Sequence, residues 1–404
     1  MQTRFILAAL RKHRIATVLI ALQISLTCAV LCNACFLVVH QFHTTQIESG
    51  VDEASLGTIK ISGFDQQQTS DLNARVLNAL SGVAGVQAVS VVNMVPFGES
   101  ADRAGVMLDQ EQKHFGGVID FYIGDGKAID AFGLKLVTGR FPSPDEYAPI
   151  TQFVPSNPPI LITRTLAAHF WPGQNPIGQR FWAMDTTFKV IGVIDHLSVS
   201  APGGGESEDP DWAVFVPAIA GTNLTGHYLI RGRPDSIMRI MKDAKKAVLG
   251  AAPDTVLDLD QSRSLVELRD TYFESSRVLV ALLIGVTFAL LGTTALGIVG
   301  LSSFWVAQRY KQIGVRRALG ATKGDILRYF LIENFIIVSL GILFGMVLAY
   351  CMNFELMKIY ELPRLPIWYA PIGAIVVWIL GQLAVLVPAL RASAILPMVA
   401  IKSN

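Results

Sequence analysis

Four long runs without an ionisable side chain constrain this chain more than any other feature of its sequence. They are Ile15–Val39, Val278–Gln308, Asn334–Phe354 and Leu365–Leu390, which continue for 25, 31, 21 and 26 residues without Asp, Glu, Lys, Arg or His. The hydrocarbon core of a bilayer is about 30 Å thick, and a helix of about 20 apolar residues crosses it. Backbone polar groups in lipid must bond within their own segment, so each run predicts a transmembrane helix.

The first run also follows a basic start of the kind found in signal peptides, with Arg4, Arg11, Lys12 and Arg14. Its apolar part is longer than the about 7–15 residues of a signal-peptide core, and no clear small-residue cleavage site follows it. We therefore expect a retained helix. The composition agrees, because 16% of the residues are charged, whereas soluble chains carry about 25%.

The charges around the four runs predict which side of the membrane each connection faces. Residues 1–14, Arg309–Glu333 and the segment after Leu390 together hold twelve Lys and Arg against two Asp and Glu. The long segment His40–Arg277 holds 19 basic and 28 acidic residues. Basic residues accumulate in cytoplasmic connections. We therefore expect both termini in the cytoplasm and His40–Arg277 outside it.

The segment His40–Arg277 is predicted to be a mixed α/β domain that folds without disulfides, since all four cysteines lie in the apolar runs. Gly57–Gly63, Thr69–Leu80 and Gln87–Met94 predict a strand, a helix and a strand, which resembles half of a ferredoxin-like split fold. Further strands are expected at Pro159–Thr163, Lys189–Ile194, Asp211–Pro217 and Tyr228–Arg231, and further helices at Leu166–Trp171 and Ile237–Leu249.

The end of this domain predicts a stalk. Ser264–Arg277 has apolar residues at helical spacing and no helix breaker before the second apolar run. A helix from Ser264 to Arg309 would hold 46 residues and measure about 69 Å. Because this is more than twice the hydrocarbon thickness, we expect a rigid stalk, with Val39–Glu53 as its partner.

Candidate chemical sites each have a simpler structural explanation. His40 and His43 have no third metal ligand nearby, and the acidic loop Glu206–Asp211 lacks the ligand spacing of an EF-hand. The loop is therefore expected to be solvated rather than calcium-bound. The three cysteines of the first run suit small packing positions better than a metal or redox site. We expect no catalytic residue, metal or cofactor in this chain, and it holds no G-x-x-x-x-G-K-[ST] nucleotide loop.

The segment Gln308–Phe335 has a residue order that positive charge on the cytoplasmic side does not explain by itself. Its sequence QRYKQIGVRRALGATKGDILRYFLIENF is a basic connector followed by an amphipathic helix. Gly320 can end one helical turn and Thr322 can cap the next helix. Interfacial anchoring explains the charge, but it does not explain the compact order RRALGAT.

This segment resembles one in the FtsX/MacB-like ABC-transporter permease family. In that family a stretch similar to REIGIRRALGA-x-x-x-DI, followed by a glutamate, lies between the second and third spans. The corresponding residues here are Lys311–Ala321, Asp325-Ile326 and Glu333. The family's ending is similar to Pro388–Ser393 with Pro397, and its periplasmic domain resembles Val137–Phe141, Phe170–Gly178 and Val190–Val193. Two positions differ from the family pattern, namely Gln312 in place of glutamate and a tail, Pro397-Met398-Val399-Ala400, without an acid.

The resemblance implies a permease subunit of the bacterial inner membrane, with a one-plus-three helix layout and a large extracytoplasmic α/β domain. It also implies a separate cytoplasmic ATPase that binds the ATP, and a second permease as homodimer or heterodimer partner. The expected segments are 1–14 (cytoplasmic), 15–39 (helix 1), 40–277 (periplasmic domain with stalks), 278–307 (helix 2), 308–329 (coupling segment), 330–353 (helix 3), 354–366 (short loop), 367–390 (helix 4) and 391–404 (cytoplasmic tail).

The ATPase is expected to bind the coupling segment. Charged side chains would set orientation and association rate, while Leu319 and Ile326 would fill a groove. The residues expected to contact the ATPase are Arg316, Arg317, Leu319, Gly320, Ala321, Lys323, Asp325 and Ile326.

The family leaves several outputs open. One is efflux of a peptide, antibiotic or similar compound through a periplasmic adaptor and an outer-membrane duct. Another is extraction of lipoproteins, and a third is control of a cell-wall hydrolase. The size of the exported domain favours the first two, and efflux is the preferred hypothesis. A membrane-anchored sensor or scaffold without a transport cycle is the alternative from a different class, and no nucleic-acid partner is expected.

Overall fold

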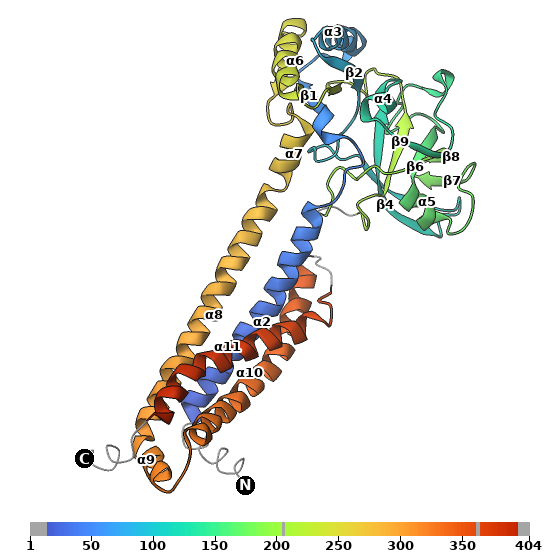
Figure 1. The fold of residues 1–404 in the computed structure, drawn as a ribbon. Helices are drawn as coiled ribbons and strands as arrows, with labels where there is room; N and C mark the ends of the chain where they lie inside the picture. Colours follow the sequence, from blue (N-terminus) through green and yellow to red (C-terminus); the bar gives the residue numbers. More distant parts are fainter. Residues whose placement is uncertain (1–13, 204–206, 361–363, 395–404) are drawn as a thin grey trace. The chain divides into compact units, whose positions relative to one another are not determined.

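The chain folds into two compact units, one from the N-terminal and C-terminal parts and one from the middle. A computed structural model describes residues 14–203, 207–360 and 364–394. The membrane unit consists of the chain up to His43 and from Ser276 onward, and the exported unit is Thr44–Ser275 (Figure 1). The predictions for residues 1–13, for 204–206 and for the tail with Pro397 concern segments outside the described residues.

The membrane unit is mainly helical in its described part. Four helical stretches are long and apolar enough to cross a bilayer: Thr17–Thr45, Leu265–Gln308, Lys323–Lys358 and Tyr369–Ser393. This confirms the predicted four helices in a one-plus-three layout. The helices are α2 (Arg14–Thr45), α8 (Glu274–Gln308), α9 (Tyr310–Ala318), α10 (Lys323–Tyr360) and α11 (Tyr369–Ser393).

Small residues let these helices approach closely. A Cβ added at Gly345 of α10 would lie 2.7 Å from the Cβ of Cys28 in α2, and one added at Gly341 would come as close to Ile24. Gly373 of α11 leaves similarly little space beside the sulfur of Cys32. Close approach at small residues is how membrane helices gain packing energy. These contacts support a packing role for the two cysteines.

The exported unit contains two β-sheets, of which the smaller is a complete ferredoxin-like split sheet. Its strand order is β11-β1-β10-β2 with antiparallel neighbours, and two strand–helix–strand halves interleave in it. The first half is the one predicted from sequence, and the second begins at His227. The elements are β1 (Leu56–Ser62), α3 (Thr69–Ser81), β2 (Val86–Val91), β10 (His227–Gly232), α6 (Ile237–Ala251) and β11 (Val256–Asp258).

The larger sheet has the order β5-β8-β6-β9-β4-β3-β7, and β7 pairs with β8 as well, so six of its strands close into a ring. The ring of Phe188 stacks on that of Phe181 at a centroid distance of 5.1 Å, and the ring of Phe121 is tilted against it at 5.2 Å. The elements are β3 (Arg103–Met107), β4 (Phe115–Gly124), α4 (Ala128–Phe132), β5 (Leu136–Gly139), β6 (Pro159–Thr163), α5 (Arg164–Phe170), β7 (Arg180–Ala183), β8 (Thr186–Ile194) and β9 (Ala213–Pro217).

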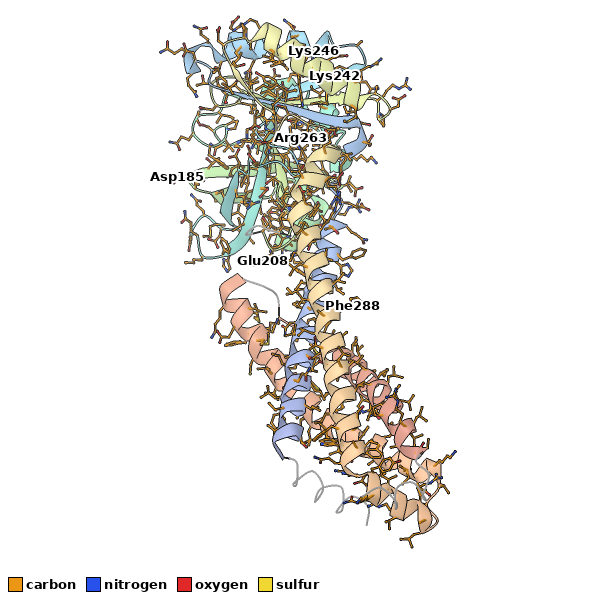
Figure 2. All side chains as sticks on the ribbon, turned by 90° about the vertical axis from the view of Figure 1, so that its left-hand side faces the viewer. Asp185, Glu208, Lys242, Lys246, Arg263 and Phe288 are labelled. Atoms are coloured by element: carbon orange, nitrogen blue, oxygen red, sulfur yellow. The ribbon has the colours of Figure 1, made fainter. Side chains whose placement is uncertain are left out.

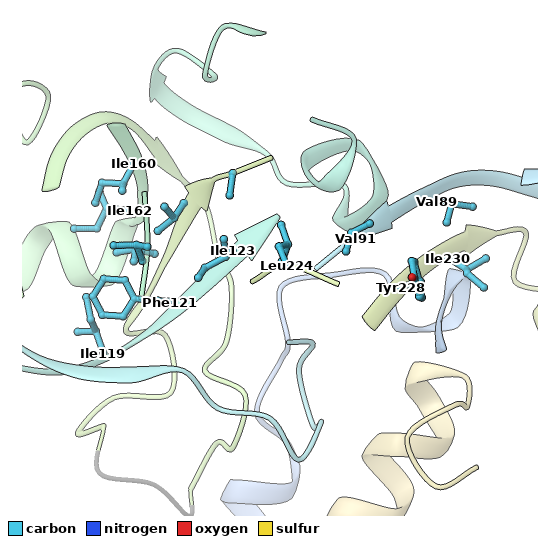
Figure 3. Packing of buried hydrophobic residues seen from close by; sticks show 14 of the residues in the cluster. Val89, Val91, Ile119, Phe121, Ile123, Ile160, Ile162, Leu224, Tyr228 and Ile230 are labelled. Atoms are coloured by element: carbon cyan, nitrogen blue, oxygen red, sulfur yellow. The ribbon is translucent and has the colours of Figure 1, made fainter. Parts of the chain in front are cut away.

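One hydrophobic cluster continues through both sheets. It includes Phe121 and Ile162 of the larger sheet and Val89 and Tyr228 of the smaller one (Figure 3). A second cluster also combines residues of both sheets with α4 and α7 (Leu265–Tyr272). Because contiguous apolar contacts define a common core, the two sheets belong to one folded unit.

The predicted stalk before the second membrane helix is helical, and its proposed partner is helical over part of its length. α7 begins after a capping box between Ser264 and Glu267 and ends at Tyr272, and α8 starts at Glu274. The side chain of Phe273 is 1% exposed and belongs to the second core cluster. The predicted helix from Ser264 to Arg309 is thus present as the helical stretch Leu265–Gln308, with one turn residue at Phe273. The partner segment Val39–Glu53 is helical only as far as Thr45.

Candidate functional site

The connection between the second and third membrane helices contains a glycine turn. Gly320 follows α9 with φ +101°. The amide of Ala321 donates to the carbonyl of Arg316 at 3.0 Å, and that of Gly320 donates to the carbonyl of Arg317 at 3.2 Å. These two bonds form the Schellman motif, which places glycine where L side chains are strained. The predicted role of Gly320 as a helix terminator is confirmed.

The next helix begins with a reciprocal cap. The Thr322 hydroxyl oxygen accepts from the Asp325 amide at 3.2 Å, and the Asp325 carboxylate accepts from the Thr322 amide at 2.9 Å and from its hydroxyl at 2.7 Å. Such an exchange satisfies two backbone donors at the start of a helix. Thr322 is thus the cap of α10, as predicted. The Asp325 carboxylate bonds to Thr322 although the side chain is exposed.

A buried ion pair joins the entry of α9 to α10. The Arg309 guanidinium donates to both carboxylate oxygens of Glu333, at 2.8 and 3.1 Å. The two side chains are 13% and 2% exposed, and Arg309 also lies over the ring of Trp305. A bidentate Arg–carboxylate pair fixes both direction and distance. Motion of the segment around α9 is therefore linked to α10.

An apolar cluster attaches the same segment to the end of α11. Ile313, Ile326 and Phe330 pack with Ala389 and Ala392, and all five side chains are buried. The prediction that Ile326 fills a groove in the ATPase does not fit this position. At 4% exposure, its apolar surface is already covered within the chain, so Ile326 supports the turn from inside.

A few side chains of the connection between the second and third membrane helices face solvent. Leu319 is 83% exposed and Val315 is 49% exposed. Four residues apart on a helical segment, they share one face. Among the other predicted contact residues, Arg316, Gly320, Lys323 and Asp325 are exposed, whereas Arg317 and Ala321 are half-buried. We call the set Val315, Arg316, Leu319, Gly320 and Lys323 the coupling surface.

Two basic residues of the segment have distinct roles. Arg316 lies over the ring of Tyr329 at 5.1 Å, which holds the guanidinium against α10. Arg317 donates to the carbonyl of Ser393, the last residue of α11, at 3.3 Å. Cations are favoured at helix C-termini. Val315 is not among the residues predicted to contact the ATPase, although it is exposed four residues before Leu319.

The described part of the acidic loop is exposed at Glu208, as expected of a solvated loop, but buried at its last residue, Asp211. Asp211 is 4% exposed, accepts from the Leu197 amide at 3.0 Å, and pairs with the His196 ring at 2.6 Å. The hydrogen bond to Asp211 raises the pKa of His196 to about 9. Within the described residues, no group of three or more His, Cys, Asp or Glu side chains could hold a metal ion.

Comparisons with known proteins agree with this architecture. Residues 17–252 match the family described as MacB-like periplasmic core domain, and residues 279–397 match FtsX-like permease C-terminal. The chain belongs to the FtsX/MacB-like family of ABC-transporter permeases.

Similar proteins include "Macrolide export ATP-binding/permease protein MacB" of Marinobacter nauticus, 28% identical over 47% of this chain and 29% of that one. The protein of the same name from Azoarcus sp. is 30% identical over 46% of this chain and 28% of that one. The matched region thus spans under a third of these relatives' length. Among solved structures, the periplasmic region of MacB from Actinobacillus actinomycetemcomitans is 15% identical, with a TM-score of 0.35 over 55% of this chain and 94% of that one.

Proposed function

We propose that this chain is the permease subunit of an ABC exporter of the bacterial inner membrane, with its termini in the cytoplasm. A separate cytoplasmic ATPase binds the ATP and docks on the coupling surface. One observation carries this proposal: Leu319 and Val315 present an apolar pair to solvent on a segment whose other side is locked to α10 and α11. Arg316 beside this pair is of a residue type enriched in binding hot spots, and apolar contacts around such a residue exclude water.

In this mechanism the ATPase moves the membrane helices, and no substrate path lined by charged residues opens between them. Closure of two ATPases on ATP would displace the coupling surface, and the Arg309–Glu333 pair and the apolar cluster would pass that displacement to α10 and α11. The exported unit would then change conformation. A second permease, as homodimer or heterodimer partner, supplies the other half of the assembly. Within this chain α8 leaves Phe288 70% exposed, to lipid or to that partner (Figure 2).

Efflux through a periplasmic adaptor and an outer-membrane duct is the preferred output. The relatives named above carry macrolide export in their names, and one from Pseudomonas putida is named for pyoverdine export. A peptide, antibiotic or similar compound is therefore the substrate class we propose. Lipoprotein extraction and hydrolase control remain the alternatives within the same mechanism.

Purification of the tagged chain from its native cells tests the docking surface. We expect an ABC ATPase with vanadate-sensitive hydrolysis to co-purify with the wild-type chain and to be lost from Leu319→Asp, because the carboxylate would have to be desolvated in an apolar groove. Leu259→Asp is the matched control, since Leu259 is 63% exposed in the exported unit. Unchanged co-purification with Leu319→Asp would reject the docking surface, and absence of any ATPase from the wild type would favour a sensor or scaffold.

A further inference from the structure

Two segments connect the exported unit to the membrane helices, and a side chain of the second bonds to the first. Arg269 lies on α7, the helix that precedes α8. Its guanidinium donates to the carbonyls of Thr45 and Ile47 at 2.9 and 2.7 Å, and to a carboxylate oxygen of Glu53 at 2.6 Å. Thr45 is the last residue of α2. The two connections are therefore held side by side where they enter the exported unit.

The surroundings of Arg269 favour a fixed position. Its side chain is 21% exposed, and its guanidinium lies over the rings of Phe97 and Phe273 at 5.0 and 5.7 Å. Both aromatic side chains are buried. Planar stacking combined with several directed donors is specific to arginine, because lysine offers a single ammonium. The contact is thus more than an exposed ion pair, which would contribute little.

The segment after Thr45 depends on such side-chain contacts. Between Thr45 and Glu53 it forms neither helix nor strand. On its other side the Glu48 carbonyl bonds to the His196 ring at 2.7 Å, and the Ser49 carbonyl accepts from the Ser198 amide at 3.0 Å. A cavity of about 540 Å³ lies beside it, lined in part by Glu48 and Arg269. The segment therefore has room to move once its contacts are broken.

We propose that Arg269 is a positioning residue that fastens the two connections together, so that displacement of either membrane helix reaches the exported unit as one motion. This inference rests on the proposed function for the source of that displacement. The fastening itself is a property of the exported unit and can be measured without an ATPase. A merely structural role would stabilise the fold but would not control how ATP changes the exported unit.

The first measurement is hydrogen exchange of the full-length permease in detergent. In Arg269→Ala we expect amides between residues 46 and 53 to exchange about tenfold faster, with β4 and β9 unchanged, because local opening is set by local contacts. Glu53→Gln, which keeps the carbonyl contacts, should give a smaller increase. Arg263→Ala is the matched control, since Arg263 is another arginine close to α7, just before its first turn, and it pairs with the exposed Asp260 (Figure 2). Unchanged exchange in Arg269→Ala would overturn the fastening.

The second measurement uses the full permease with its ATPase, trapped with ATP and vanadate. Trapping should change hydrogen exchange in the exported unit of the wild type. In Arg269→Ala we expect that change to be lost while ATP hydrolysis stays within about twofold, which separates coupling from folding. A wild-type response in Arg269→Ala would overturn the inference and leave the proposed function intact. No response in the wild type would overturn the proposed function, and the coupling role of Arg269 with it.

Discussion

At the scale of single residues, buried polar groups of the exported unit are committed to specific partners. His227 shows this, because its Nδ1 lies 3.1 Å from the Asn93 carbonyl and its Nε2 lies 2.7 Å from the Thr58 hydroxyl. A neutral imidazole satisfies both, since Nδ1–H donates to the carbonyl and Nε2 accepts from the hydroxyl. Burial lowers the pKa of His227 to about 4. The folded state therefore resists protonation of this ring.

This pKa predicts acid sensitivity. An unfolded histidine has a pKa of about 6.5, so between pH 6.5 and 4 the unfolded chain gains a proton that the folded chain does not. The contribution of His227 is complete above pH 6.5 and is lost as the pH falls towards 4, by about 3 kcal/mol in the free energy of unfolding. Guanidinium unfolding of the full chain in detergent at pH 7 and 4.5 measures the loss. His227→Gln cannot titrate, so this variant should lose the part of the pH dependence that comes from His227. An equal pH dependence of the unfolding free energy in both proteins would contradict the low pKa of His227.

At the scale of helices and strands, the sequence predicts best where one physical requirement dominates. The membrane helices follow from the absence of charge, and β6, β8 and β9 follow from short apolar runs that are buried in the larger sheet. β4 was missed because Gly116-Gly117 interrupts its pattern, although Phe121 and Ile123 are buried. The helical spacing from Ser264 onward predicts the stretch Leu265–Gln308, but it gives no sign of the single turn residue at Phe273.

The Arg309–Glu333 pair carries a prediction about α9 and α10. Glu333→Gln leaves a mostly buried guanidinium without its counter-charge, and breaking a buried pair from one side costs roughly 3–5 kcal/mol. We expect a lower thermal midpoint in detergent and faster hydrogen exchange in α9. Replacing both side chains with methionine should restore much of the stability, because no buried charge remains.

A matched control for that experiment is Glu355→Gln. Glu355 pairs with Lys358 on the same helix, but both side chains are more than half exposed. Exposed pairs of this kind contribute little to stability. If Glu333→Gln and Glu355→Gln lower the thermal midpoint equally, the pair does not link α9 to α10.

At the scale of the whole molecule, the sequence located the candidate site. It did not show which residues of the segment face solvent and which are buried within the chain. Motif order and charge indicated the coupling segment, and Gly320 and Thr322 end and start helices as predicted. Which side of the segment faces outward depends on contacts with α11, and these placed Ile326 inside and Val315 outside. Arg269 was beyond sequence reasoning, because its partners at Thr45 and Ile47 are backbone carbonyls.

The distribution of charge over the whole chain makes a final prediction, about topology. The coupling segment is basic and the exported unit is acidic, so a membrane-impermeant maleimide should label Lys113→Cys in intact spheroplasts and Lys323→Cys only after permeabilisation. Lys113 and Lys323 are both exposed, so access depends on the side of the membrane alone. Native Cys351 is exposed on α10 and is replaced by serine in both variants. Labelling of Lys323→Cys in intact spheroplasts would reverse the orientation and would remove the coupling surface from the compartment that holds ATP.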